Sequence, residues 1–204
     1  MLRIIGDVHG KVDWAIRGRS SYLDLVDGCT HSLQVGDLGD AEVYAVLVDQ
    51  VDPERHRFVP GNHDDYDHLP PHALGDFGLS TLGGVEFFFV RGAPSIDKAF
   101  RIRQGVPWWP REELDEAAFS AALEAYGAAK PALVVTHDCP ANIAPFLVKP
   151  AGGRTGEWLE RMLAAHRPRR WVFGHIHQSW SREIGGTRFQ CLDELVTLDL
   201  HTPG

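Results

Sequence analysis

The sequence predicts an α/β fold built around a parallel sheet, and two patterns lead to this prediction. First, short apolar runs recur that each end in small or polar residues, as buried strands do where they meet a functional loop. These runs are residues 2–5, 32–35, 57–59, 132–135 and 169–173. Second, the early runs are separated by segments with helical spacing, Val12 to Val26 and Ala41 to Val51, so strand and helix alternate. The 204 residues suit a single domain over residues 1–204.

The remaining elements are expected to complete this fold. A bulky strand is predicted at Glu86 to Val90, and the irregular loop that follows, Arg91 to Pro110, is long enough to be functional. A helix is predicted from Arg111 to Tyr126, with acidic residues in its first turns that suit the helix dipole and form a solvated face. These acidic residues are Glu112, Glu113, Asp115 and Glu116. The last predicted elements are a helix at Gly156 to His166 and closing strands at Arg188 to Leu192 and Leu195 to Leu200, joined by a turn at Asp193 and Glu194.

Composition and charge limit the possible partners. The net charge of −8 argues against a protein that binds a nucleic-acid polymer through its overall field. A small phosphorylated substrate remains compatible with this charge, because bound cations would reverse the local sign. The three cysteines are far apart and give no disulfide framework, no secretory leader opens the chain, and the longest apolar runs are too short for a bilayer. We therefore expect a cytoplasmic protein without a membrane partner.

Metal-ligand residue types follow five of the predicted strands. They are Asp7 and His9, Asp37, Asn62 and His63, His137, and finally His175 and His177. The carboxyl ends of parallel strands meet at one edge of a sheet, so these loops should converge. In extended geometry, both members of an Asp-x-His or His-x-His pair project to the same side. The sequence thus predicts one polar cluster at the strand ends.

This cluster has the chemistry of a transition-metal site. Carboxylate, imidazole and amide ligands together suit Mn, Fe or Zn better than Mg or Ca. The set exceeds what one ion needs, and two ions about 3.5–4 Å apart require a shared ligand such as a carboxylate. Asp37 is the candidate bridge because it stands alone at its strand end, whereas Asp40 is expected to cap the helix that starts near Ala41.

Taken together, the motifs "GDVHG", "VGDLGD", "GNHDD", "THDCP" and "GHIHQ" resemble the signature of the calcineurin-like metallophosphoesterase superfamily, in order and without a gap over residues 6–178. The resemblance implies a two-sheet α/β sandwich with a dimetal site at the strand C-terminal ends. It implies two divalent transition metal ions, with Mn²⁺ favoured and Fe, Zn or Ni as alternatives. One ion would be bound by Asp7, His9, Asp37 and His177, and the other by Asp37, Asn62, His137 and His175.

The resemblance also implies a mechanism, in which a metal-bridging hydroxide attacks phosphorus. His63 would be the catalytic side chain, either as the acid for the leaving oxygen or as a clamp on the transition state, with Asp64 orienting its ring. The segments "RGAPSIDKAFR" and "GVPWWP" further resemble small metallophosphoesterases of phages and bacteria. If the protein is phage-encoded, the expected cytoplasmic location is the cytoplasm of the host.

The expected substrate is a small nucleotide-like or cyclic phosphodiester. The protein phosphatase and dinucleoside tetraphosphatase branches of this superfamily carry an arginine shortly after the metal aspartate, where it helps to hold a terminal phosphate, and "GDLGDAEV" has none. One alternative is a phosphomonoesterase, such as a protein phosphatase, that recruits Arg91, Arg101 or Arg103 from the middle loop. Another is a scaffold that has kept the fold without catalysis, as in a retromer subunit of the superfamily.

Other residues near these motifs have ordinary interpretations beside functional ones. Trp108 and Trp109 would stack on a nucleobase or, more commonly, anchor their loop by packing. Cys139 is expected to be a packed thiol rather than a ligand. His68 and His72 are expected to be surface or satisfied structural histidines; the alternative is that they line the cleft, although Pro70 and Pro71 indicate an exposed turn.

Overall fold

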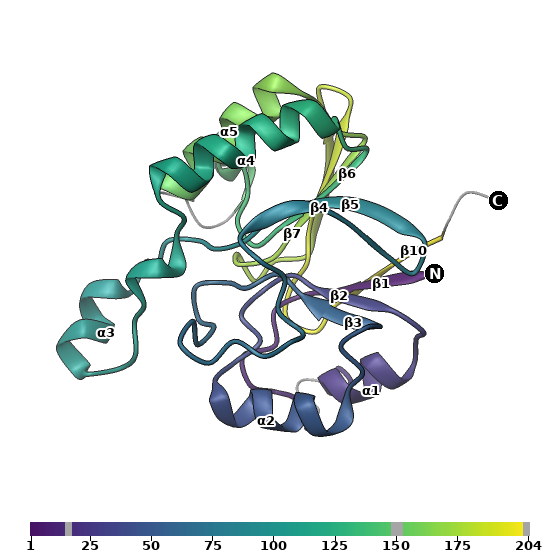
Figure 1. Ribbon diagram of the computed structural model, residues 1–204, viewed down its shortest axis with the longest axis vertical. Coiled ribbons are helices and arrows are strands. Elements are labelled where there is room, and N and C mark those ends of the chain that lie inside the picture. Colours follow the sequence, from purple (N-terminus) through teal and green to yellow (C-terminus); the bar gives the residue numbers. More distant parts are fainter. Residues whose placement is uncertain (15–17, 148–152, 202–204) are drawn as a thin grey trace.

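The computed structural model describes residues 1–14, 18–147 and 153–201, and its strands form two mixed sheets (Figure 1). The first sheet has the order β10-β1-β2-β3, with β1, β2 and β3 parallel and β10 antiparallel at one edge. Its strands are β1 (Leu2–Ile5), β2 (Ser32–Gln34), β3 (His56–Phe58) and β10 (Thr197–Leu200). The parallel core of this sheet confirms the alternating pattern predicted for the first part of the chain.

The second sheet has the order β4-β5-β6-β7-β9-β8. Its central strands β5, β6, β7 and β9 are parallel, and an antiparallel strand closes each edge. The strands are β4 (Phe77–Leu82), β5 (Val85–Val90), β6 (Leu133–Thr136), β7 (Arg170–Phe173), β8 (Trp180–Ile184) and β9 (Thr187–Cys191). The edge strands β4 and β8 were not predicted, because their half-exposed sequences contain no continuous apolar run.

The two sheets pack face to face, and helices cover their outer faces (Figure 1). Strand β5 shows why its sequence is apolar throughout: Phe87 and Phe89 lie in the core between the sheets, whereas Phe88 packs beneath the helices. The helices are α1 (Tyr22–Asp27) and α2 (Ala41–Gln50) on the first sheet, and α4 (Glu116–Ala129) and α5 (Arg154–Ala165) on the second. The predicted two-sheet α/β sandwich is therefore confirmed.

The first two predicted helices have different outcomes. Helix α2 begins at Ala41 as expected, and the Asp40 side chain accepts hydrogen bonds from the backbone N–H groups of Glu42 and Val43. Helix α1 begins only at Tyr22, because Ser21 and Asp24 form a capping box there. The predicted start at Val12 is therefore wrong, because residues 12–14 and 18–21 are not helical, whereas residues 22–26 are; residues 15–17 lie outside the described part.

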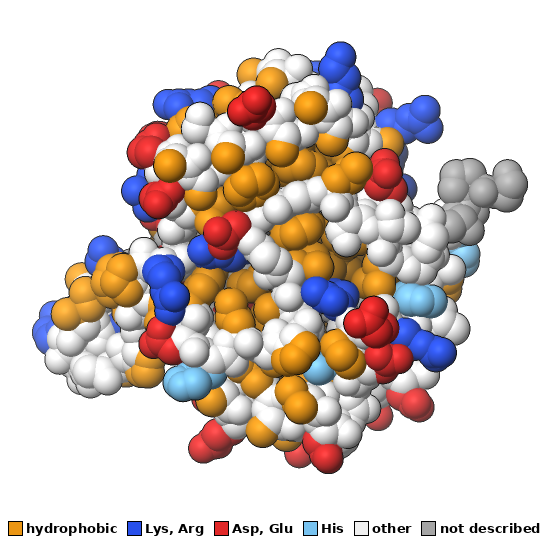
Figure 2. Space-filling view, in the orientation of Figure 1, with side chains coloured by type: hydrophobic (Ala, Val, Ile, Leu, Met, Phe, Trp, Pro, Cys, Tyr) orange, Lys and Arg blue, Asp and Glu red, His pale blue; other side chains and the backbone are white. Residues whose placement is uncertain are grey.

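The middle of the chain differs most from the prediction. The helix expected at Arg111 is a short 3-10 turn, Pro110–Glu112, and α4 starts after Asp115, whose side chain caps it. Within the loop expected to be irregular, residues Lys98–Gln104 form helix α3, which ends at a left-handed Gly105. Figure 2 shows hydrophobic side chains gathered on α3, which projects from the sandwich. None of the described helices combines the length and the apolar character needed to cross a bilayer.

Candidate dimetal site

The loops after β1, β2, β3, β6 and β7 bring the predicted ligands together. Four of them, Asp7, His9, Asp37 and His177, have ligand atoms within 4.8 Å of one another, and the same limit holds for Asp37, His137 and His175. These are the two sets named from the sequence, except that the amide of Asn62 joins the second set through a separate contact. Sequence positions up to 170 residues apart thus meet at the carboxyl ends of the strands.

In the first cluster, imidazole nitrogens and carboxylate oxygens face a common centre. The two Nε2 atoms of His9 and His177 are 2.8 Å apart. His177 Nε2 lies 3.2 Å from Asp7 Oδ2, and His9 Nε2 lies 3.7 Å from Asp37 Oδ2. Two oxygen and two nitrogen ligands at such separations match the donor set of a divalent transition metal ion.

In the second cluster, His137 is held in the orientation that a metal ligand requires. Its Nδ1 lies 2.9 Å from the carbonyl oxygen of Val35, and because a carbonyl can only accept, Nδ1 carries the proton. Asp37 Oδ1 and Asn62 Oδ1 lie 3.3 Å and 3.1 Å from Nε2, and because both oxygens accept, Nε2 also carries a proton here, which a bound metal ion would replace. Such a hydrogen bond on the far ring nitrogen fixes the tautomer of a ligating histidine.

Asp37 lies between the two clusters. Its Oδ2 faces His9 in the first cluster and its Oδ1 faces His137 in the second. Oδ1 also accepts a hydrogen bond from the backbone N–H of His63, at 2.7 Å, so the carboxylate is fixed in this orientation. A carboxylate that presents one oxygen to each of two donor sets has the geometry of a bridging ligand.

The ligand loops turn through left-handed backbone conformations. Positive φ angles occur at His9 (48°), Asp37 (58°), His175 (62°) and His177 (52°). This corrects the expectation that the Asp-x-His and His-x-His pairs are extended, although both members of each pair still reach the cluster. Such conformations cost about 1–3 kcal/mol each in non-glycine residues and persist where the surrounding structure enforces them.

Glycine before a ligand allows the loops to approach closely. A Cβ on Gly174 would lie 2.1 Å from Asp7 Oδ1, and a Cβ on Gly61 would lie 2.3 Å from Asp37 Oδ1. Both positions precede the ligand-bearing residues of their motifs, so the glycines in "GNH" and "GHIH" are needed because a side chain would displace a carboxylate.

Burial and neighbouring charges shift the pKa values of the cluster. Burial lowers the pKa of His137, but the adjacent Asp37 carboxylate outweighs it and raises that pKa to about 10. Burial raises the pKa of Asp37, yet the nearby imidazoles, His137 first, hold it well below its usual value. Burial, assisted by His137, lowers the pKa of His175 to about 3, and burial also lowers that of His9. A cation bound here takes the place of the proton on His137, because a ligating imidazole must be neutral.

A buried hydrogen-bond chain that the sequence did not reveal orients Asn62. The Asn62 amide donates from Nδ2 to Ser95 Oγ at 3.1 Å, and Ser95 Oγ donates to Glu112 Oε2 at 2.5 Å. The Ser95 backbone N–H donates to the other carboxylate oxygen at 2.9 Å. With its NH₂ group engaged, Asn62 must present its oxygen to the site. The prediction that Glu112 belongs to a solvated acidic face is therefore wrong, because this carboxylate is buried against Ser95.

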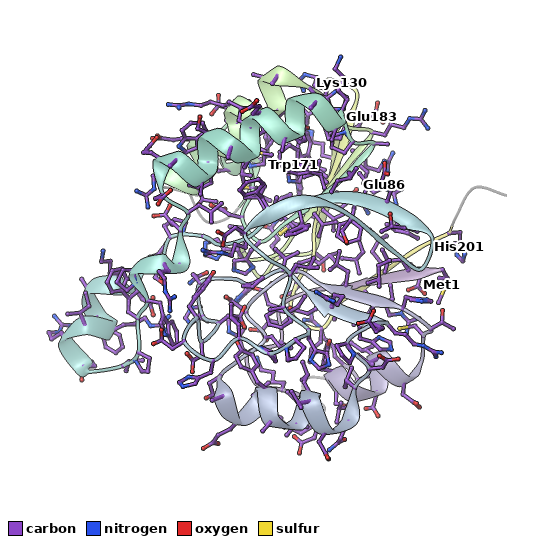
Figure 3. All side chains as sticks on the ribbon, viewed as in Figure 1. Met1, Glu86, Lys130, Trp171, Glu183 and His201 are labelled. Carbon is purple, nitrogen blue, oxygen red and sulfur yellow. The ribbon has the colours of Figure 1, made fainter. Side chains whose placement is uncertain are left out.

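Two further contacts fix the cluster from outside. Glu194 Oε1 lies 3.4 Å from His177 Nδ1, and Lys11 Nζ bonds the other oxygen of this carboxylate at 2.9 Å. Trp171, which lies between the second sheet and the helices above it (Figure 3), donates from Nε1 to Thr136 Oγ1 at 2.9 Å. Thr136 is the last residue of β6, so the indole anchors the strand end from which His137 projects.

The structure corrects the expected role of Asp64. Instead of orienting the His63 ring, the buried Asp64 carboxylate accepts five hydrogen bonds that tie two ligand loops together. The donors are the backbone N–H groups of Asp37, Leu38, Gly39 and Gly61 and the hydroxyl of Tyr44, at 2.7–3.1 Å. The His63 ring instead contacts Arg101, whose Nη1 lies 2.9 Å from His63 Nδ1.

Of the tryptophans and arginines predicted as candidates in the middle loop, some lie at the site and others do not. Trp109 lines a cavity together with His63 and Arg101, whereas the Trp108 ring lies beneath the Lys98 ammonium, 3.9 Å from ring centroid to Nζ. Arg91 pairs with Asp76 and donates to the carbonyl of Arg111, and Arg103 is exposed. Only Arg101 among the three candidate arginines therefore contacts a residue of the site.

The remaining side chains singled out in the sequence lie away from the clusters. Cys139 is fully buried in the core beneath α4 and α5, which confirms the packed thiol. His72 is buried and its Nε2 lies 2.9 Å from the Val51 carbonyl oxygen, as expected of a structural histidine, so it lies neither in the cleft nor on an exposed turn. His68 is exposed and pairs with Asp65 at 2.8 Å.

The α/β sandwich brings together two Asp/His clusters whose side chains could hold divalent metal ions. The sequence matches the family model of calcineurin-like phosphoesterases over residues 2–179, so the chain belongs to this family. No protein among those with curated descriptions matches it.

Several solved structures are similar. GAP50 of Plasmodium, described as the anchor in the inner membrane complex, is 13% identical with a TM-score of 0.55, covering 94% of this chain and 71% of that one. Phosphopantetheinyl hydrolase of Mycobacterium tuberculosis is 14% identical (TM-score 0.47, 95% and 89% covered), and zinc-bound Vps29 of Entamoeba histolytica is 17% identical (TM-score 0.40, 95% and 73% covered). At these identities, the likeness concerns the fold alone.

Proposed function

We propose that the protein hydrolyses phosphoesters with the help of two divalent transition metal ions, of which Mn²⁺ fits the ligands best and Fe, Zn or Ni are alternatives. The observation that carries this proposal is the position of Asp37, which turns one carboxylate oxygen to each of two donor clusters. One ion would be held by Asp7, His9, Asp37 and His177, and the other by Asp37, Asn62, His137 and His175. The donor set fits the ions, because oxygen and imidazole nitrogen are mixed and the Nδ1 contact of His137 turns its Nε2 toward the other two donors, Asp37 and Asn62.

Two such cations supply a hydroxide nucleophile at neutral pH and neutralise charge on the phosphate. The chain's own contribution beyond the ligands is His63, whose ring lies 5.3 Å from that of His9, centroid to centroid. Because Arg101 donates to His63 Nδ1, the ring is neutral and carries its proton on Nε2. His63 can therefore donate a hydrogen bond to a phosphate oxygen or to the leaving oxygen, which is the role proposed for it.

For the substrate, we propose a small nucleotide-like or cyclic phosphodiester. Supporting this choice, residues 38–44, which follow the metal aspartate, contain no arginine that could hold the extra charge of a terminal phosphate. A second candidate, a phosphomonoesterase, is favoured by one observation. The buried guanidinium of Arg101 lies beside His63, where it could hold the extra charge of a terminal phosphate.

The test is a panel of mono-aryl and bis-aryl phosphates assayed with Mn²⁺, Zn²⁺, Ni²⁺ and Mg²⁺. Diester turnover above monoester turnover is expected, and a large preference for monoesters would replace the first candidate by the second. Asp37→Asn should lose bound metal and activity together, whereas Asp115→Asn, the same change at the cap of α4, should keep both. If no phosphoester is turned over by folded, Mn²⁺-loaded protein, the non-catalytic scaffold is the better description.

A further inference from the structure

The α3 segment, residues 96–109, contains a helix that projects from the sandwich (Figure 1). Its residues Arg101, Val106 and Trp109 line a cavity together with Asp37 and His63 of the candidate site. Most of this segment is exposed, including apolar side chains that a helix would normally bury. These are Ile96, Phe100, Ile102 and Val106, with exposed fractions of 74%, 52%, 57% and 43% (Figure 2). Such a segment contributes little to the core, so packing against the core does not explain its sequence.

Arg101 is the exception on this segment, because only 5% of it is exposed. Its Nη1 contacts His63 Nδ1 at 2.9 Å, and its guanidinium carbon lies 5.8 Å from the Trp109 ring centroid. The Nε–H of Arg101 has no hydrogen-bond partner, and no carboxylate pairs with this arginine in the described part of the chain. A buried cation without a counter-ion is costly, so an anionic ligand beside it would be stabilising.

A cavity of about 290 Å³ opens beside this guanidinium. Its lining includes the polar side chains of His9, Asp37, Asp40, His63 and Arg101 and the apolar side chains of Val43, Val106 and Trp109. The volume is close to the lower end of small-molecule pockets, roughly 300–1,000 Å³. The cavity therefore suits a ligand that combines an anionic group, bound beside Arg101, with a flat apolar group that packs on Trp109.

We infer that the α3 segment forms a substrate subsite in which Arg101 binds a non-bridging phosphate oxygen next to His63 and Trp109 packs on a planar group of the substrate. The substrate class is then an aryl or nucleoside phosphoester. This inference rests on the proposed function and adds Arg101 and Trp109 to it as two residues that determine substrate specificity. Arginine is suited to this role because its planar fork donates two hydrogen bonds to a phosphate, and indole rings stack on aromatic groups.

The chain offers matched controls for both residues. Arg103 is on the same helix as Arg101 but is exposed, and Trp108 adjoins Trp109 but packs under Lys98. The experiment compares Arg101→Met with Arg103→Met, and Trp109→Ala with Trp108→Ala, in Mn²⁺-loaded protein. Each variant is assayed for kcat and KM on mono-aryl, bis-aryl and alkyl phosphates, and for binding of inorganic phosphate by calorimetry.

Arg101→Met should weaken phosphate binding tenfold or more and lower kcat/KM for the monoester more than for the diester, with Arg101→Lys intermediate. Trp109→Ala should raise KM for aryl substrates several-fold and leave alkyl substrates unchanged, whereas both control variants should match the wild type. If Arg101 only positions His63, all substrates lose kcat equally and phosphate binding is unchanged, which would overturn the inference.

Failure of the inference and failure of the proposed function can be told apart. Active wild-type protein whose Arg101→Met and Arg103→Met variants bind phosphate equally would refute the subsite and leave the proposed hydrolysis intact. Inactive wild-type protein would refute the hydrolysis, and weaker phosphate binding by Arg101→Met would still support the subsite.

Discussion

Replacing Asp64 by Asn tests whether this carboxylate organises the metal loops or orients the catalytic histidine. Asp64 Oδ2 accepts from the backbone N–H groups of Asp37 (2.9 Å) and Gly61 (2.7 Å). Oδ1 accepts from the backbone N–H groups of Leu38 (2.9 Å) and Gly39 (3.1 Å) and from the Tyr44 hydroxyl. All five partners are donors, so both oxygens must act only as acceptors.

An asparagine offers one oxygen and one NH₂ group in the same space. If its oxygen replaces Oδ1, the NH₂ group faces the N–H groups of Asp37 and Gly61, and both lose their acceptor. Each buried donor left without a partner costs about 1–3 kcal/mol, so the substitution should lower the free energy of unfolding by about 2–6 kcal/mol. That is a large share of the roughly 5–15 kcal/mol by which a domain is typically stable.

The measurement is urea unfolding followed by circular dichroism, in the presence of a chelator so that metal binding does not contribute. Tyr44→Phe is a milder variant for comparison, because it removes only the hydroxyl that donates to Asp64 and accepts from the Asp65 N–H. It should cost about 1–3 kcal/mol. The reasoning would be refuted by an Asp64→Asn protein as stable as the wild type that nevertheless loses kcat, since that result would mean that Asp64 acts on the His63 ring.

Two further predictions concern the metal site. Mn²⁺ at about 100 times its Kd should stabilise the protein by about 2.7 kcal/mol and raise Tm by about 5–11 °C in differential scanning calorimetry. Asp37→Asn should reduce this rise, and an unchanged Tm in wild-type protein with Mn²⁺ and with Zn²⁺ would count against a metal site. Glu112→Gln should destabilise the protein by about 1.5–3 kcal/mol and weaken Mn²⁺ binding about 10–100-fold, because Ser95 then orients Asn62 less well. Equal Mn²⁺ titrations for this variant and the wild type would contradict the role assigned to the Ser95–Glu112 chain.

The parallel strands and the ligand clusters followed from local sequence patterns. Asp37 and Asn62 could be predicted to meet because each follows a short apolar run, and the carboxyl ends of parallel strands lie at one edge. Asp40 could be predicted as a helix cap because capping depends on residues only two or three positions away. These features depend on residues that are close together in the sequence, so they can be predicted from the sequence pattern.

Other helix and strand boundaries could not be predicted, because the sequence contained competing signals whose relative strength the pattern does not give. Pro110 and a run of acidic residues suggested one helix, but the chain turns at Glu112 because burying that carboxylate against Ser95 satisfies two donors. Strands β4 and β8 exist because they pair with β5 and β9, and their half-exposed sequences carry no independent signal.

By itself, then, the sequence determined which side chains form the clusters, since strand order and residue type suffice for that. The tertiary structure alone decided which groups hold and surround them. Asp64 accepts hydrogen bonds from the loop amides, and Glu112 accepts one from Ser95, which orients Asn62. Arg101 donates to His63, 38 positions away in the sequence. The physical reason is that burial makes each polar group take whatever partner the folded chain brings within hydrogen-bond distance, and that partner is set by packing rather than by its neighbours in sequence.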